Sequence, residues 1–180
     1  DLVSHIKSLE HKGYQFEGAE ASFELMLRAR QGTFTPFFDV ADSRVNVSYD
    51  RSGHNRADAM LKVIVDGEIE QTAADGVGPV DALSNALKKA LVRFYPELNE
   101  VKLTDYKVRV LNEQDGTSAK VRVLIESSDG RISWSTVGVS ENIIEASWQA
   151  FSDSLNYKLV KTRDIQNLEK KPQDGQHTES

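Results

Sequence analysis

The chain has 180 residues, enough for one or two domains with a hydrophobic core, and it contains no cysteine, which excludes disulfides and thiolate metal sites. Its 22 basic and 28 acidic residues give a formal net charge of -6, and the basic residues do not cluster, which argues against a general nucleic-acid-binding protein. Because there is neither an apolar run of membrane-spanning length nor a signal-peptide pattern, we expect a cytoplasmic protein with no membrane partner.

Residues 1–34 are predicted to form a helical linker segment ahead of the main domain. Apolar residues recur at intervals of three and four from Leu2 to Glu10 and again from Ala19 to Arg30, which indicates two short helices. The stretch Gly13–Gly18 between them breaks this pattern with a glycine at each end. Helices this short are not stable alone in water, so we expect them to pack on the following domain or on another part of the protein.

Residues 35–160 are predicted to form a domain of two βββα units, about 37–97 and 101–158. In each unit three stretches of alternating apolar and polar residues precede an amphipathic stretch. Because each unit has one sheet face and one helix stripe to bury, we predict an α+β fold with antiparallel sheets and the helices packed on one side. Turns are predicted at Asp66-Gly67, Asp115-Gly116 and Asp129-Gly130, and the units align with Asp66-Gly67-Glu68-Ile69 on Asp129-Gly130-Arg131-Ile132 and Ala82-Leu83 on Ile143-Ile144.

Residues 161–180 are predicted to be a disordered tail. From Lys161 the sequence turns polar, and it ends in the run Lys170–Ser180. A segment of this composition buries too little apolar surface to offset the entropy lost on ordering.

No pattern in the chain indicates catalysis. The four histidines, His5, His11, His54 and His177, have neither metal-ligand spacing nor a nucleophile motif beside them. The stretch Gly76–Gly78 lacks the lysine of a P-loop and the spacing of a dinucleotide-binding motif. We therefore expect a binding domain with no catalytic residue, metal or cofactor of its own.

The helix start at Gly76-Val77-Gly78-Pro79-Val80-Asp81 is the candidate binding site. Glycines allow unusual backbone angles, and Pro79 suits the first helical position because its missing N–H would be unpaired there. Free N–H groups at the positive end of a helix dipole can hold a carboxylate or phosphate. A second helix start follows Gly138-Val139-Ser140, with Ser140 as the predicted N-cap. If the two starts converge about a pseudo-two-fold axis, they form a site for a free amino acid beside apolar or aromatic side chains.

The same residues carry a resemblance to a known family. The runs Gly76–Ala82 and Gly138–Ser147, in this order at the two units, resemble the C-terminal regulatory domain of the 2-isopropylmalate synthase and citramalate synthase family. The N-terminal stretch Gly13–Leu25 is most similar to the linker of the citramalate synthase branch, and the likeness extends over roughly residues 1–160. The resemblance implies a pair of βββα units that dimerises and binds leucine or isoleucine at the dimer interface, where the amino acid inhibits a distant acyl-transfer site.

The resemblance also implies which residues bind the effector. By position, Gly76, Val77, Gly78, Pro79, Val80 and Asp81 match the first effector motif, and Gly138, Val139 and Ser140 match the second. Backbone N–H groups around Gly78 and Ser140 are the expected partners of the effector carboxylate. Ile132, Trp134 and Tyr106 are candidates for selectivity toward its side chain, although the sequence does not separate leucine from isoleucine.

The family further implies what a longer protein would contain. Its catalysis is attributed to a separate TIM barrel with a divalent metal, which condenses acetyl-CoA with a 2-oxo acid in branched-chain amino-acid biosynthesis. This chain, which starts at Asp1 rather than Met, is therefore expected to be the linker and sensor of such an acyltransferase.

Two other interpretations stay open. A helix, three antiparallel strands and a helix is also the element order of double-stranded-RNA-binding domains, although the acidic charge balance opposes RNA binding. The chain is also compatible with a structural dimerisation domain that has no effector.

Overall fold

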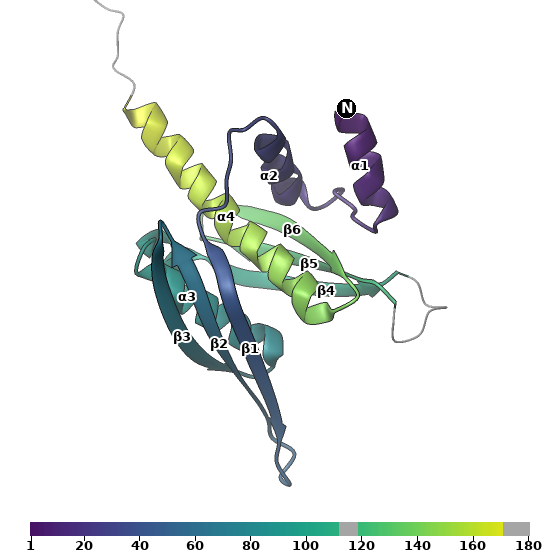
Figure 1. Ribbon diagram of the computed structural model, residues 1–180, viewed down its shortest axis with the longest axis vertical. Coiled ribbons are helices and arrows are strands. Elements are labelled where there is room, and N and C mark those ends of the chain that lie inside the picture. Colours follow the sequence, from purple (N-terminus) through teal and green to yellow (C-terminus); the bar gives the residue numbers. More distant parts are fainter. Residues whose placement is uncertain (112–118, 171–180) are drawn as a thin grey trace, which may run out of the picture.

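The computed structural model describes residues 1–111 and 119–170, and the predicted turn at Asp115-Gly116 lies outside them (Figure 1). The chain opens with α1 (Leu2–His11) and α2 (Glu20–Arg30), which confirms the two predicted short helices. α2 packs on the second half of the chain and buries Ala21, Ser22 and Leu25, whereas α1 buries none of its residues. The expected packing on the following domain therefore holds for α2.

Two βββα units follow, as predicted. Each unit has its own antiparallel three-stranded sheet, in the order β1-β2-β3 or β4-β5-β6, and the fold is α+β. The first unit comprises β1 (Asp39–Tyr49), β2 (Asn55–Val65), β3 (Glu68–Gly76) and α3 (Pro79–Val92); after the 3₁₀ helix η1 (Pro96–Glu100), the second comprises β4 (Lys102–Val110), β5 (Val121–Ser128), β6 (Ser133–Ser140) and α4 (Ile143–Glu169).

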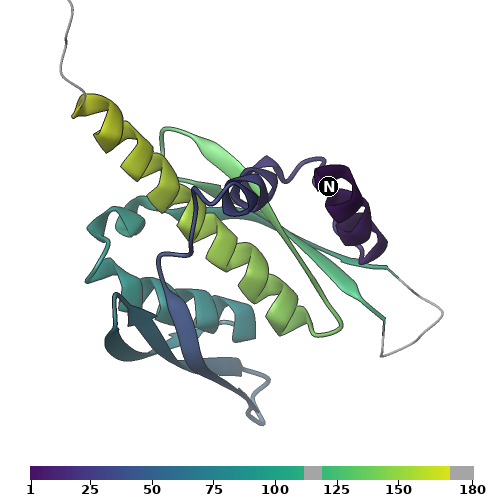
Figure 2. The same cartoon turned by 45° about the horizontal axis from the view of Figure 1, so that its top comes forward.

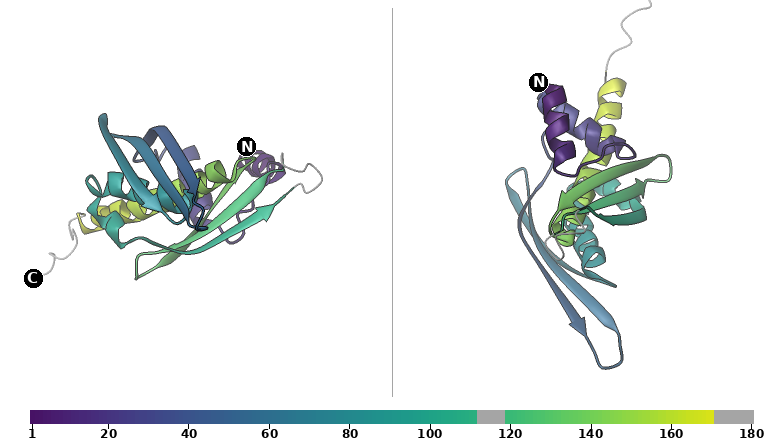
Figure 3. Two further views of the ribbon diagram at one scale, coloured as in Figure 1. Left: turned by 90° about the horizontal axis from the view of Figure 1, so that it is seen from below. Right: turned by 90° about the vertical axis from the view of Figure 1, so that its right-hand side faces the viewer.

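The two long helices lie between the two sheets (Figure 3). α3 packs on β2 and β3, α4 packs on β5 and β6, and the helices also contact each other. Every second residue of β2 from Ala57 to Val65 is buried, so the apolar alternation read from the sequence marks the face under α3. Each sheet thus keeps its helix on one side, and side chains of both units share one core.

Hydrogen bonds that recur in both units define the repeat. The hydroxyl of Thr72 donates to the carbonyl of Ala86 (2.9 Å), and that of Thr136 donates to the carbonyl of Ala150 (2.6 Å). The two threonines are 64 residues apart in the sequence, and so are the two alanines. The predicted helix alignment of Ala82-Leu83 on Ile143-Ile144 is therefore wrong by three residues. An amphipathic pattern looks almost the same after a shift of about one turn, so it could not set this register.

The predicted start of the disordered tail, at residue 161, is too early. α4 continues past Lys161 to Glu169, and its polar residues make ion pairs with α2. Lys161 lies 2.7 Å from Glu24, and Arg28 lies 2.6 Å from Asp164. The last turns of α4 are polar because their side chains form ion pairs with α2. Composition alone does not reveal this partner. Residues 171–180 lie outside the described part of the chain.

Gly76 and Gly138 let the helices approach the strands closely. A Cβ atom on Gly76 would overlap the backbone of Ala82 in α3, and one on Gly138 would overlap the carbonyl of Ala146 in α4. Gly78 differs, because a Cβ atom there would meet no atom within 4 Å and its φ of -158° is ordinary extended backbone. Glycine is therefore needed at positions 76 and 138 because there is no room for a Cβ atom, and not because the backbone angle is unusual.

Replacing Gly76 with alanine is expected to lower the free energy of unfolding by about 3 kcal/mol, because the added methyl group overlaps helix backbone that cannot move alone. Gly78→Ala is the matched control, with an expected loss of about 1 kcal/mol from a poorer N-cap. Urea denaturation of both variants measures the difference. Equal losses in the two variants would contradict the close-approach role of Gly76.

Candidate functional site

The first turn of α3 has unpaired N–H groups. Gly78 is the N-cap and has no side chain to accept from the helix, and Pro79 takes the first helical position as predicted. The Asp81 carboxylate reaches back to accept a hydrogen bond from the N–H of Val77 (3.0 Å), which closes the loop. Within residues 1–111 and 119–170, the N–H groups of Val80 and Asp81 have no acceptor. This helix start can therefore accept an anion.

The first turn of α4 is already capped. Asn142 is its N-cap and accepts from the N–H groups of Ile144 (2.8 Å) and Glu145 (3.4 Å). Ser140 is instead the last residue of β6, and its hydroxyl donates to Glu145 (2.6 Å). The predicted N-cap at Ser140 is wrong because the strand continues up to that residue, so that Asn142 reaches the cap position. The two helix starts are thus unequal.

The sequence analysis left open whether the two helices converge near their starts, and in the structure the early turns of α3 and α4 do converge. They meet in an apolar crevice of about 10 Å³. A cavity of this size holds about one water molecule, so this chain alone has no room there for a leucine or isoleucine side chain. The crevice is lined by Val80, Leu83 and Ser84 of α3, by Ser147, Trp148 and Phe151 of α4, and by Leu103 and Ile125 of the second sheet.

The three residues proposed for effector selectivity are not brought together. The hydroxyl of Tyr106 lies 2.7 Å from that of Ser147, which places Tyr106 beside the crevice. Trp134 is only 6% exposed, and its indole N–H donates to the carbonyl of Ser154 (3.1 Å), so it is a core residue beneath α4. Ile132 lies in the turn before β6, at the opposite end of this strand from the start of α4.

Gly138 and Val139 of the second predicted motif hold α4 against β6. Gly138 faces this helix, as its close approach to Ala146 shows. Val139 packs on the other side of β6, in a small cluster with Ala19 and Val137. Its N–H donates to Gln149 of α4 (3.0 Å).

Several apolar side chains on the inner faces of the two sheets and near the starts of α3 and α4 are exposed, which the sequence analysis did not find. The β1–β2 hairpin extends well past the helices (Figure 1), so Val47 and Tyr49 on its inner face have no helix over them. Val77, next to the candidate anion site, is 85% exposed. We call this surface the hairpin face; it comprises Val47, Tyr49 and Val77, with Val108 and Val110 on the inner face of β4 and Ile143 at the start of α4.

Buried polar contacts attach α2 to the second unit. The Ser22 hydroxyl donates to the carboxylate of Asp153 in α4 (2.7 Å) and accepts from the N–H of Val137 on the edge strand β6 (3.0 Å). Burial raises the pKa of Asp153 from its usual 3.8 to about 6. Figure 2 shows α2 lying against α4 and β6, away from the start of α3.

The part of the chain that the structure describes contains no group of three or more histidine, aspartate or glutamate residues that could hold a metal ion. None of its helices combines the length and the apolar character needed to cross a membrane.

Comparisons with known proteins agree on one family. Residues 17–159 match the model of the LeuA allosteric (dimerisation) domain. The chain is 52% identical over 174 residues to an (R)-citramalate synthase of Geobacter sulfurreducens and 52% identical over 161 residues to an (R)-citramalate synthase of Aquifex aeolicus. It is 38% identical over 103 residues to a 2-isopropylmalate synthase of Aquifex aeolicus. These alignments cover 94%, 89% and 57% of this chain but only 32%, 30% and 18% of the relatives.

Asp153→Asn is expected to be more stable than the parent protein above about pH 6. An acid whose pKa is raised in the fold contributes its full stability below its unfolded pKa of 3.8, and this contribution is lost as pH rises through its folded pKa of about 6. The lost contribution amounts to about 3 kcal/mol. Asparagine carries no charge, and its side-chain oxygen can still accept from Ser22.

Urea denaturation of both proteins between about pH 4 and pH 7 measures this difference. The range avoids the titration of Asp129, whose pKa is lowered to about 2 by hydrogen bonds from backbone N–H groups and by Lys158. Asp42→Asn, at the exposed ion pair with Arg44, serves as the control. If the free energies of unfolding of Asp153→Asn and of the parent protein change with pH in parallel, burial does not raise the pKa of Asp153.

Proposed function

The chain belongs to the LeuA allosteric (dimerisation) domain family, and we propose that it is the amino-acid sensor of a longer citramalate or 2-isopropylmalate synthase. It spans about a third of the length of its citramalate synthase relatives. The proposed activity of the whole protein is the condensation of acetyl-CoA with a 2-oxo acid in the cytoplasm, in a separate barrel that holds a divalent metal. Isoleucine or leucine, as the end product, would bind this domain and inhibit that reaction.

The uncapped start of α3 is the observation that carries this proposal. The carboxylate of the amino acid accepts hydrogen bonds from the N–H groups of Val80 and Asp81 in the first turn of α3. Its side chain points to the apolar crevice between α3 and α4, beside Tyr106. Ser140 has an indirect part, because it holds Glu145 in the first turn of α4.

We propose that a second copy of the chain completes this site. The crevice of about 10 Å³ is too small for the effector, so the site must widen or gain walls from a partner. The hairpin face lies next to it, and Val77 belongs to both the loop and this face. Exposed apolar surfaces of this kind mark association sites. A homodimer formed through the hairpin face would place each effector beside the interface.

Inhibition requires that the effector favour one arrangement of the protein over another, because a ligand shifts only states that it binds unequally. α2 is attached to α4 and β6, whereas α1 has no buried residue. The connection between them has positive φ values at Gly13 and Gly18. We propose that α1 contacts the catalytic part and that this connection and the Gln31–Pro36 segment act as hinges.

Gly78→Ser is expected to stabilise the domain and to weaken effector binding by at least about tenfold. A serine N-cap accepts from the N–H groups of the first turn and so competes with the effector carboxylate. There is space for the new side chain. Gly78→Ala adds the same Cβ atom without the hydroxyl, so it should bind like the parent protein.

Isothermal calorimetry with isoleucine and leucine in parallel tests this prediction. Saturable binding of one amino acid by the parent and by Gly78→Ala, with loss in Gly78→Ser, supports the proposed site. Equal binding by the serine variant would mean that the carboxylate binds elsewhere. If a well-folded dimer binds neither amino acid, the chain is a structural dimerisation domain or requires the catalytic part for binding.

Tyr49→Asp is expected to dissociate the dimer, because the side chain is 77% exposed on the hairpin face and a two-fold interface carries each substitution twice. Met60→Asp is the control, since Met60 is 42% exposed on the opposite side of the same sheet. Sedimentation equilibrium gives the two dissociation constants. Dissociation by Met60→Asp alone would place the dimer interface on the outer face of the first sheet.

A further inference from the structure

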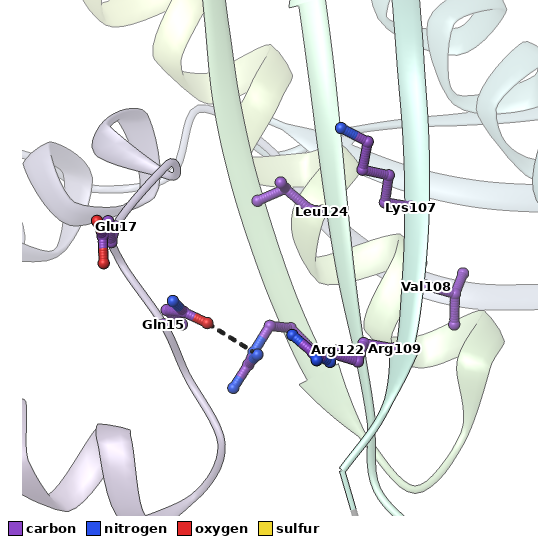
Figure 4. Close-up of a pocket in the computed structure, with 7 residues that line it drawn as sticks. All are labelled: Gln15, Glu17, Lys107, Val108, Arg109, Arg122 and Leu124. Carbon is purple, nitrogen blue, oxygen red and sulfur yellow. Dashed lines mark hydrogen bonds between the residues drawn. The ribbon is translucent and has the colours of Figure 1, made fainter.

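A basic hollow of about 500 Å³ lies on the outer face of the second sheet, away from the proposed effector site (Figure 4). One wall is the stretch between α1 and α2, and the other consists of β4 and β5. Its volume is within the range typical of small-molecule sites. The hollow is lined by Gln15, Glu17, Lys107, Arg109, Arg122 and Leu124, and it is bordered at β4 by Val108, whose side chain leaves the sheet on the other face.

Two arginines lie side by side on neighbouring strands in this hollow. Arg109 of β4 and Arg122 of β5 are cross-strand partners in the antiparallel ladder, so their side chains leave the sheet on the same face. Like charges in this position destabilise a sheet unless an anion lies between them. Burial and the charge of Arg109 both lower the pKa of Arg122, in agreement with an uncompensated positive pair.

The protein supplies neutral hydrogen-bond partners to Arg122. The Nε atom of Arg122 donates to the carbonyl of Gly13 (2.8 Å), and Nη1 donates to the side-chain oxygen of Gln15 (3.0 Å). Among the described residues, no carboxylate lies within ion-pair distance of either guanidinium. Glu17 lines the hollow but lies beyond ion-pair distance of both guanidinium groups, so among the described residues neither arginine has a carboxylate partner.

We propose that this hollow binds the phosphate group of a small phosphorylated ligand. Two adjacent guanidinium groups present paired N–H donors that match phosphate oxygens, and a dianion would remove their mutual repulsion. Lys107 lies two residues from Arg109 on the same strand face and adds a third cation, which Asp105 now pairs at 3.0 Å. Leu124 supplies apolar surface for the rest of the ligand. This site needs neither the amino-acid effector nor the dimer.

Calorimetric titration of the whole chain with inorganic pyrophosphate, at constant ionic strength, tests the proposal. We expect saturable binding with a dissociation constant of about 1 mM or lower. Arg109→Met removes one guanidinium from an exposed position and should weaken binding at least about tenfold, whereas Arg109→Lys should fall in between because an ammonium group cannot bind in a bidentate manner. Arg131→Met, in the exposed turn at the other end of the same sheet, should bind like the parent protein.

The alternative results are equally definite. No saturable binding of pyrophosphate, or equal loss in Arg109→Met and Arg131→Met, would overturn the site. Succinate is titrated as a second anion with two carboxylates. Binding of succinate as tight as that of pyrophosphate would overturn the assignment to phosphate. Retention of isoleucine or leucine binding by Arg109→Met would show that this site and the effector site are separate.

Discussion

The close contact between each helix and the last strand of its sheet is the constraint on which the rest of the structure depends. Gly76 and Gly138 lack the Cβ atoms that would separate helix from strand, and Thr72 and Thr136 donate to carbonyls inside the helices. These contacts set where α3 and α4 begin and how they lie between the sheets. The converging early turns, the crevice between them and the uncovered hairpin face all follow from that placement.

The two units share this packing but differ at their helix starts. Asn142 satisfies the first turn of α4 with its own side chain, whereas Gly78 leaves the first turn of α3 unpaired. Of the two helices that pack on the sheets, α3 therefore has the start that is available to an anion. Because the adjoining crevice is too small for a branched amino acid, the proposed sensor depends on a second copy or on a rearrangement. Effector binding and dimerisation would then be thermodynamically linked.

The N-terminal segment connects to this domain through the second unit. Ser22, Asp153 and the ion pairs of Arg28 and Lys161 attach α2, while the stretch from Gly13 to Gly18 crosses the outer face of the second sheet. The proposed phosphate site lies under this stretch, and the proposed effector site lies on the inner side of the same sheet. The second sheet therefore separates the two candidate ligand sites, each formed by residues that are distant in the sequence.

The sequence by itself determined the order of helices and strands in the two units and the start of α3 at Pro79, because strand alternation, helical spacing and turn chemistry are local properties of the chain. It determined neither the helix register of the repeat nor the end of α4. It also identified the loop that carries the unpaired N–H groups. Only the tertiary structure decided that Asn142 caps α4, that Trp134 is a core residue and that Arg109 faces Arg122. These outcomes depend on where a strand ends, on burial and on cross-strand register, which involve residues far apart in the chain and so leave no periodic pattern in the sequence.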